Sequence, residues 1–99
     1  MAKKHDQAGR VVAKKLGGQY DPTASPDVKG KQGRAEVKTM ASEIPKAKQQ
    51  LGTRPGKAYV VLPKPEHGKA RDRLRGSGVG LMNYKGEITK RSGTGRKKT

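Results

Sequence analysis

The most constraining segment of this sequence is the apolar run Ala-Tyr-Val-Val-Leu at residues 58–62, which is bounded by Gly56 and Pro63. A continuous run of this length, rich in β-branched side chains, predicts a strand that is buried on both faces. A strand of this kind lies at the centre of a sheet that has helices on either side. We therefore expect an α/β fold.

Three segments predict the helices. Residues 5–16, 42–51 and 66–75 carry apolar side chains at helical spacing, and a glycine follows each segment directly. The second segment starts at Ser42 and has Pro45 in its first turn, where proline is tolerated. Its predicted apolar face consists of Ile44, Ala47 and Leu51.

Shorter segments predict the remaining strands. Residues 18–24 form a short polar strand, residues 27–40 form a hairpin, and residues 79–84 form a last strand from which residues 85–88 turn back. The hairpin reverses at residues 31–32, because glycines on both sides of this pair supply the backbone freedom that a turn requires.

The predicted hairpin brings two carboxylates together. It pairs Asp27 with Glu36, whose Cβ atoms would lie roughly 4.5–5.5 Å apart. The alternation of a strand places Lys38 on the same face as Glu36 and leaves an apolar opposite face. Directly opposed like charges destabilise a sheet, so the arrangement favours a divalent cation between the two acids. Hard cations such as Mg²⁺ prefer oxygen ligands of this kind.

Charge narrows the class of partner. The chain has 24 Lys and Arg residues against 8 Asp and Glu residues, a formal net charge of +16 on 99 residues. This balance favours a polyanion, and nucleic acid is the commonest one. A membrane partner is not expected, since no apolar run approaches the roughly 18–20 residues that span a bilayer and no sustained basic amphipathic helix is present.

Two absences bear on the cellular compartment. The chain has no cysteine, which excludes disulfides and thiolate metal sites. The N-terminus lacks the apolar region of a secretory signal. We therefore expect an intracellular, cytoplasmic protein.

The length leaves room for one thin domain. Only 29% of the residues are hydrophobic, so partial disorder is an alternative that the composition leaves open. We expect a single domain over residues 1–89 and a disordered basic tail over residues 90–99, which contain no apolar side chain. A homodimer that shares its core would relieve the shortage of apolar surface.

The predicted order of elements, together with Pro26-Asp27 and Glu36-Val37-Lys38, resembles the PD-(D/E)xK nuclease superfamily, which has the restriction-endonuclease-like fold. The resemblance covers about residues 5–88, and topology and spacing carry as much of it as the short motif. It implies a small αβββαβαβ core with a mixed sheet flanked by helices. It also implies hydrolysis of phosphodiester bonds in DNA that depends on Mg²⁺ or Mn²⁺.

The resemblance implies roles for individual residues. Asp27 and Glu36 match the two metal-binding carboxylates of the family, and the backbone carbonyl of Val37 would be a further ligand. Lys38 matches the lysine that orients or polarises the attacking water. Gln49 matches a glutamine that usually faces the active site from the helix after the motif.

The first helix departs from the family pattern. A further carboxylate normally comes from this helix, often a Glu followed by Arg, but here the pattern meets Gly9-Arg10. Asp6, about one turn earlier, is the nearest substitute as a metal ligand. The simpler alternative is that Asp6 complements the helix dipole.

Basic side chains outside the motif are the expected contacts to nucleic-acid phosphates. They are Lys69, Arg71, Arg73 and Arg75 in the third helix and Lys29 and Lys31 in the hairpin. Residues 76–80 lack the Gly-Lys-Ser/Thr ending of a phosphate loop and follow a helix, which predicts a plain loop. His5 and His67 have no cysteine or second histidine at ligand spacing, so no zinc site is expected.

The sequence therefore predicts a metal-dependent endonuclease that acts on DNA as a homodimer, with RNA left open as a substrate. Two alternatives remain. One is a basic nucleic-acid-binding protein without chemistry, either a nuclease fold that lacks its site or a ribosome-associated or packaging protein. The other is a largely disordered basic protein.

Overall fold

The computed structural model describes residues 2–21, 23, 26–52 and 56–92. These residues form three α-helices, two short 3₁₀ turns and six strands. The helical elements are α1 (Ala2–Leu16), η1 (Ala41–Glu43), α2 (Ile44–Leu51), η2 (Lys64–Glu66) and α3 (His67–Leu74). The strands are β1 (Gly18–Tyr20), β2 (Val28–Gly30), β3 (Gly33–Val37), β4 (Ala58–Val61), β5 (Gly80–Met82) and β6 (Ile88–Lys90).

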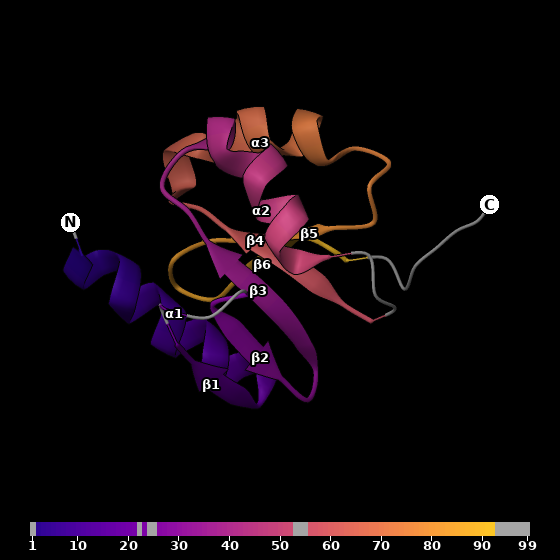
Figure 1. The fold of residues 1–99 in the computed structure, drawn as a ribbon. Helices are drawn as coiled ribbons and strands as arrows, with labels where there is room; N and C mark the ends of the chain where they lie inside the picture. The colour runs from indigo at the N-terminus through magenta and orange to yellow at the C-terminus, as the bar shows by residue number, and fades with distance from the viewer. Residues whose placement is uncertain (1, 22, 24–25, 53–55, 93–99) are drawn as a thin grey trace.

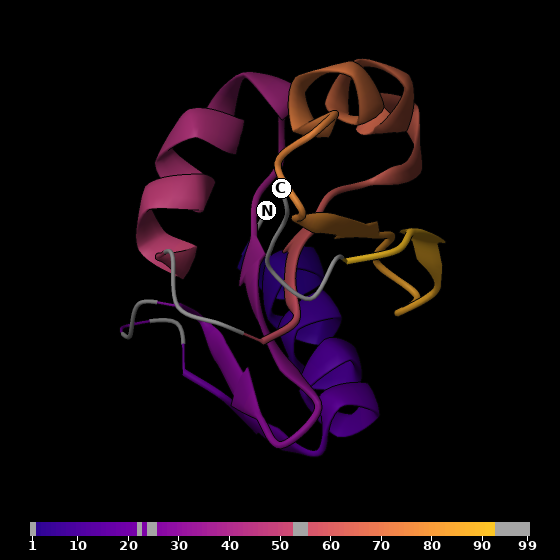
Figure 2. The ribbon, with the colours of Figure 1, turned by 90° about the vertical axis from the view of Figure 1, so that its right-hand side faces the viewer.

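The six strands form one mixed sheet in the order β1-β2-β3-β4-β5-β6. The first three strands are antiparallel, β3, β4 and β5 are parallel, and β6 returns antiparallel to β5. Parallel neighbours need a crossover connection, and α2 and α3 provide the two crossovers. In Figure 1, α3 lies at the top and the β2–β3 hairpin at the bottom. Figure 2 shows α1 and α2 on opposite sides of the strands.

The central strand is β4, and it is buried on both faces, as the apolar run predicts. Tyr59 and Val61 pack in a core cluster with α1. Val60 and Leu62 pack in a second cluster with α2 and α3. The prediction of an α/β fold with a mixed sheet flanked by helices is confirmed at this level.

The β2–β3 hairpin turns at residues 31–32, as predicted. The register pairs Val28 with Ala35. Both residues and Val37 pack in the α1 cluster, which confirms the predicted apolar face of the hairpin. Because side chains alternate along a strand, Glu36 lies on the opposite face, toward α2.

The helices follow the predicted segments closely. α1 ends at Leu16 and α2 ends at Leu51, each before a glycine with positive φ, 69° at Gly17 and 76° at Gly52. α1 begins at Ala2, earlier than residue 5, where the sequence pattern placed its start. Within the described residues, no helix has both the length and the apolar character that a membrane span requires.

Two of the predicted strands end earlier than expected. β5 ends at Met82, two residues before residue 84, because Asn83 is the centre of a tight turn. The side-chain oxygen of Asn83 accepts hydrogen bonds from the backbone N–H groups of Lys85 and Glu87 over 2.9 and 3.0 Å. Likewise β1 ends at Tyr20, before residue 24. Local side-chain bonds to the backbone thus compete with sheet pairing.

The sheet extends past residue 89, where the sequence analysis placed the end of the domain. β6 runs through Lys90, which pairs with Leu81 of β5. Ser92 follows the strand, and its hydroxyl accepts a hydrogen bond of 3.0 Å from the Ala58 N–H. Lys90 therefore belongs to the sheet, and the Ser92 side chain is bonded to the start of β4. The rest of the predicted tail, residues 93–99, lies outside the described residues.

Candidate active site

Asp27 and Glu36 lie together at the end of the hairpin opposite its turn, as the predicted register requires. The Asp27 N–H donates a hydrogen bond of 2.8 Å to Glu36 Oε1. The Val37 N–H donates one of 3.1 Å to Asp27 Oδ2. Both acids are buried, with exposed fractions of 6% for Asp27 and 2% for Glu36. Each carboxylate is therefore oriented by the backbone of the opposite strand.

The electrostatics of Glu36 favour a positive charge nearby. Burial raises the pKa of the Glu36 carboxyl above its usual value, and the charge of Asp27 raises it further. The Lys38 ammonium acts in the other direction, since its Nζ lies 3.5 Å from Glu36 Oε2. One lysine thus faces a pair of acids whose mutual repulsion it only partly offsets.

Lys38 is fixed by its backbone on both sides. Its N–H donates a hydrogen bond of 2.9 Å to Val61 O at the end of β4. Its carbonyl accepts one of 2.7 Å from the Tyr84 hydroxyl. The side chain is 13% exposed. Lys38 is therefore held near the acids with most of its side chain buried.

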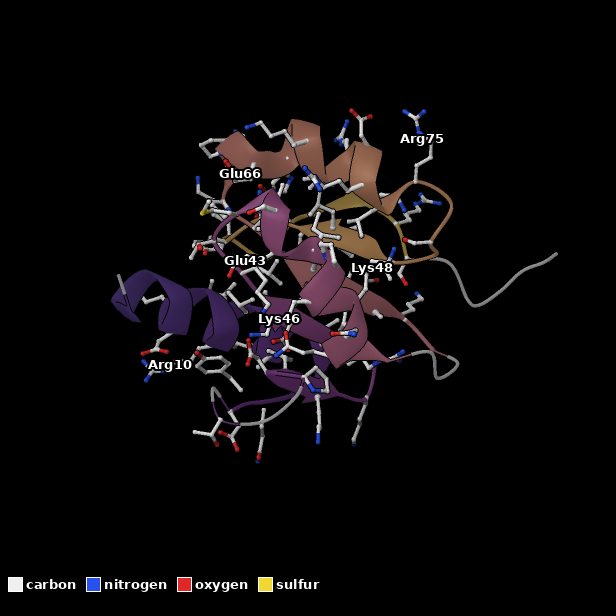
Figure 3. The ribbon with its side chains drawn as sticks, turned by 45° about the horizontal axis from the view of Figure 1, so that its top comes forward. Arg10, Glu43, Lys46, Lys48, Glu66 and Arg75 are labelled. Atoms are coloured by element: carbon white, nitrogen blue, oxygen red, sulfur yellow. The ribbon has the colours of Figure 1, made fainter. Side chains whose placement is uncertain are left out.

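Glu43 closes the turn that follows Lys38, a contact that the sequence analysis did not identify. Its Oε1 accepts hydrogen bonds of 3.0, 3.0 and 3.1 Å from the Thr39 N–H, the Thr39 hydroxyl and the Met40 N–H. Burial opposes ionisation, but these hydrogen bonds and the Lys38 charge outweigh it and lower the pKa of Glu43 below its usual value. Figure 3 shows Glu43 and Glu66 near the starts of α2 and α3.

Tyr20 links the first helix to the acid pair and is the main residue that sequence reasoning missed. Its hydroxyl donates a hydrogen bond of 2.7 Å to Asp6 Oδ1. Burial, this hydrogen bond and the charges of Asp6 and Asp27 together raise the pKa of Tyr20 well above its usual value. In the structure Tyr20 pairs with Val28, the neighbour of Asp27. The sequence signal for this residue was its place in the predicted strand over residues 18–24.

The packing of Tyr20 also explains why residue 9 of α1 is a glycine. A Cβ built on Gly9 would lie 2.3 Å from Cδ1 and Cε1 of Tyr20, so the ring occupies the space that a side chain would need. The Tyr20 ring therefore excludes a carboxylate from position 9. Asp6 instead reaches the site region through the Tyr20 hydroxyl.

The structure gives no support to the predicted role of Gln49. Gln49 is exposed, and it lies two residues from each of the buried Ala47 and Leu51, which places it on the outer face of α2. Its neighbour Gln50 is half-buried, and Oε1 of Gln50 has no hydrogen-bond partner among the described residues. The amide on the inner side of α2 is therefore that of Gln50.

The residues fit one hard cation better than two. Asp27 and Glu36 offer carboxylate oxygens, and the Val37 carbonyl stays a predicted ligand beside them. In the described part of the chain, no group of three or more His, Cys, Asp or Glu side chains is placed to hold a metal. Asp6 thus does not join the acid pair in one ligand cluster, and water and a phosphate would supply the remaining ligands of a cation.

The predicted phosphate-binding residues form two separate surfaces. Lys69, Arg71 and Arg73 of α3 are exposed, as is Arg75 directly after the helix. The hairpin, which lies at the other end of the molecule in Figure 1, carries the exposed Lys29 and Lys31. Arg71 donates a hydrogen bond of 3.1 Å to the Thr89 carbonyl, and Arg75 donates one of 3.2 Å to Asp72.

His67 has a structural role in joining α3 to the sheet. It is buried, and its ring nitrogens lie 2.8 Å from Leu62 O and 2.8 Å from Thr89 Oγ1. The ring joins the start of α3 to β4 and β6. The side chain of His5 lies outside the described residues.

Comparison of the chain with protein-family models, curated proteins and solved structures finds no match.

Proposed function

We propose that this protein is a metal-dependent endonuclease that hydrolyses phosphodiester bonds in DNA, with a restriction-endonuclease-like core of the PD-(D/E)xK type. The observation that carries the proposal is the gathering of Asp27, Glu36 and Lys38 at the end of the β2–β3 hairpin opposite its turn. Two oriented carboxylates and an ammonium are the groups that metal-assisted hydrolysis of a phosphodiester requires.

Each of the three side chains has a defined task in this proposal. A divalent cation held by Asp27 and Glu36 would neutralise the phosphate and lower the pKa of a bound water. The backbone N–H groups of Asp27 and Val37 orient the two carboxylates. Lys38 donates a hydrogen bond to the attacking water or to a phosphate oxygen and offsets the charge that develops there.

Asp6 of α1 and Tyr20 of β1 support the site. The hydrogen bond between them fixes the Tyr20 hydroxyl, whose pKa responds to the charge of Asp27 as well as that of Asp6. We assign Asp6 a positioning role rather than that of a first ligand.

A cleavage assay tests the proposal. Supercoiled plasmid, branched DNA and single-stranded DNA are incubated with the protein and Mg²⁺ or Mn²⁺, and products are separated on gels. Glu36→Gln and Lys38→Met are expected to reduce cleavage by at least about 100-fold, the scale on which loss of charge stabilisation or proton transfer acts.

Two matched variants control for structural damage. Glu66 also accepts a backbone hydrogen bond of 2.8 Å, from the Ala41 N–H, so Glu66→Gln controls for Glu36→Gln. Lys90 is also half-buried, with Nζ 2.9 Å from Val79 O, so Lys90→Met controls for Lys38→Met. Both controls are expected to keep wild-type cleavage. Cleavage that survives Glu36→Gln and Lys38→Met would sink the catalytic proposal.

A basic nucleic-acid-binding protein without chemistry is the second candidate. The net charge of +16 favours it, as does the lack of a cluster of three metal-ligating side chains in the described part of the chain. It predicts salt-dependent binding of DNA and RNA with no cleavage of any substrate by either metal. Binding by fluorescence anisotropy, measured beside the cleavage assay, separates the two candidates.

We also propose a homodimer, because two symmetric sites are needed to cut two strands together. Val11 and Ile88 are exposed apolar side chains, each 42% exposed. Sedimentation velocity is expected to show twice the chain mass of 10.7 kDa. A species of single-chain mass at all concentrations contradicts this part of the proposal.

A further inference from the structure

A groove of about 690 Å³ lies beside the β2–β3 hairpin. Among the residues that the structure describes, its lining contains no acidic side chain and has four basic ones: Lys29, Lys31, Arg34 and Lys57. Pro26 also lines the groove and directly precedes Asp27 in the chain. The groove therefore begins next to the candidate active site and continues toward the hairpin turn.

The groove and the acid pair share one face of the hairpin. The register pairs Lys29 with Arg34, and each lies two positions from its acid, Asp27 or Glu36. Side chains two residues apart on a strand point to the same side. Lys57 is brought alongside by a hydrogen bond of 3.0 Å from the Arg34 N–H to its carbonyl. The basic side chains therefore line a path that leads to the acids.

Gly56 keeps part of this path open. It lines the groove with a φ of 111° that side chains rarely adopt, and a Cβ built on it would lie 3.6 Å from Nη1 of Arg34. Gly30 instead faces α1, because a Cβ built on it would lie 2.3 Å from Leu16 O. A phosphate can approach the main chain closely where no side chain projects.

Arg34 forms the wall between the groove and α2. Its Nε donates a hydrogen bond of 2.7 Å to Leu51 O at the C-terminal end of α2. This contact ties the hairpin to the helix, whose outer side carries Lys46 and Lys48 (Figure 3). The hydrogen bond to Leu51 thus fixes Arg34 at one side of the groove. Exposed lysines line its rim: Lys29, Lys31 and Lys57.

We propose that this groove binds one polynucleotide strand by its phosphates and leads that strand to Asp27 and Glu36. The inference rests on the proposed function, because it assigns the path of the substrate to that site. Lys29 lies on β2 two residues after Asp27, and Lys31 lies in the turn at the far end of the hairpin, so both offer phosphate contacts along the path that leads to the acids.

The chemistry of the lining sets the kind of recognition. The described residues of the groove include no aromatic side chain on which a base could stack. Contacts of lysine with phosphate carry no sequence information but depend strongly on salt. The groove therefore binds strands of any sequence, and its contribution appears in the salt dependence of binding.

Binding measured without cleavage tests this inference. Fluorescence anisotropy with a labelled single-stranded DNA oligonucleotide in EDTA compares the wild type with the triple variant Lys29→Ala, Lys31→Ala and Lys57→Ala over a range of salt. The slope of log K against log salt is expected to fall by about 2, since each lost contact with a single strand removes about 0.7. The dissociation constant at low salt is expected to rise roughly tenfold or more.

A second triple variant controls for net charge. Lys15, Lys64 and Lys85 are exposed and lie outside the groove, so their replacement by Ala removes the same charge. This control is expected to keep a slope near that of the wild type. If the slope of log K against log salt falls equally in the two triple variants, the proposal that the groove binds the strand is rejected. If circular dichroism shows the groove variant to be unfolded, the single variant Lys31→Glu in the exposed turn replaces it, with Lys85→Glu as its control.

The outcomes for the groove and for the proposed function are separable. If the groove variant lowers the slope of log K against log salt but the wild type cleaves no substrate, the groove proposal stands and the endonuclease proposal is rejected. If cleavage depends on Glu36 but the groove variant binds like its control, the endonuclease proposal stands and the groove proposal is rejected.

Discussion

The backbone N–H of Asp27 donates a hydrogen bond of 2.8 Å to the carboxylate of Glu36, and both residues are buried. The Asp27 carboxylate in turn accepts from the N–H of Val37, which follows Glu36. Two acids that repel one another across a hairpin are thus each anchored to the backbone beside the other. The repulsion that remains is what a bound cation would relieve.

Removing the charge of Glu36 is expected to stabilise the protein while it abolishes cleavage. Glu36→Gln should raise the free energy of unfolding at pH 7 by about 1 kcal/mol, because an uncharged amide relieves the burial of charge and still accepts the Asp27 N–H. Urea denaturation of wild type and variant measures the difference.

The pH dependence of this gain has a defined sign. Burial, followed by the Asp27 charge, raises the pKa of Glu36 in the folded state, so ionised Glu36 costs stability. That cost is absent below the pKa of an unfolded Glu, about 4.3, and grows as the pH rises through the folded pKa. The two proteins should therefore be equally stable near pH 4 and diverge by pH 7. A variant less stable than wild type at pH 7 contradicts this account.

Glu43→Gln is expected to show the opposite pH dependence. Burial disfavours the charge of Glu43, but hydrogen bonds from Thr39 and Met40 outweigh it and lower the pKa. The stabilisation is present above the unfolded pKa and is lost as the pH falls through the lower folded pKa. The variant should lose about 1 kcal/mol at neutral pH and almost nothing in acid, as measured by denaturation at both pH values. Glu87→Gln, whose side-chain oxygen can still accept from the Asn83 amide, controls for loss of charge alone.

Gly9→Ala is expected to destabilise a helix that alanine would ordinarily stabilise. The new Cβ would lie 2.3 Å from the Tyr20 ring, and such overpacking costs about 1–3 kcal/mol. In the double variant with Tyr20→Ala the clash is absent, so its cost should be less than the sum of the two single costs. Thermal melts of the four proteins measure the coupling.

The matched control for this prediction is Gly68→Ala in α3. Apart from its own helix, no atom of the described residues lies within 4 Å of a Cβ built on Gly68, so the helix propensity of alanine should stabilise the protein by up to about 1 kcal/mol. Opposite signs at Gly9 and Gly68 support the packing of Tyr20 against α1. Equal stabilisation at both positions would show that the Tyr20 ring does not occupy that space.

His67→Phe is expected to weaken the fold without changing the chemistry. Phenylalanine keeps a ring in the buried position but loses the contacts of 2.8 Å with Leu62 O and Thr89 Oγ1. Leaving a buried carbonyl unpaired costs about 2 kcal/mol. Cleavage per folded molecule below the melting temperature should match wild type. A selective loss of cleavage with an unchanged melting temperature would assign His67 to the active site.

Local patterns in the sequence predicted much of the sheet. The run at residues 58–62 predicted a strand with two buried faces, because β-branched side chains without polar alternation leave no face for water. Glycines beside residues 31–32 predicted the hairpin turn. From that turn and the period of a strand, the pairing of Asp27 with Glu36 followed directly.

Predictions across helices were weaker, since one residue turns a helix by about 100°. The resemblance to the nuclease family pointed to Gln49, which is exposed, whereas its neighbour Gln50 is half-buried. A shift of one residue along the helix therefore separates the two environments. The same limit applied to α1, where the absence of a side chain at Gly9 had no explanation until the Tyr20 ring was found against it.

The sequence by itself thus determined the α/β class, the hairpin and the meeting of Asp27, Glu36 and Lys38, because these depend on contacts between residues close along the chain. Only the tertiary structure decided that Tyr20 bonds to Asp6 and that Lys57 lies beside Arg34. The first contact requires α1 to pack against the sheet, and the second requires the parallel pairing of β3 with β4 after a crossover. Such pairings are set by how whole faces bury one another, which no short stretch of sequence encodes.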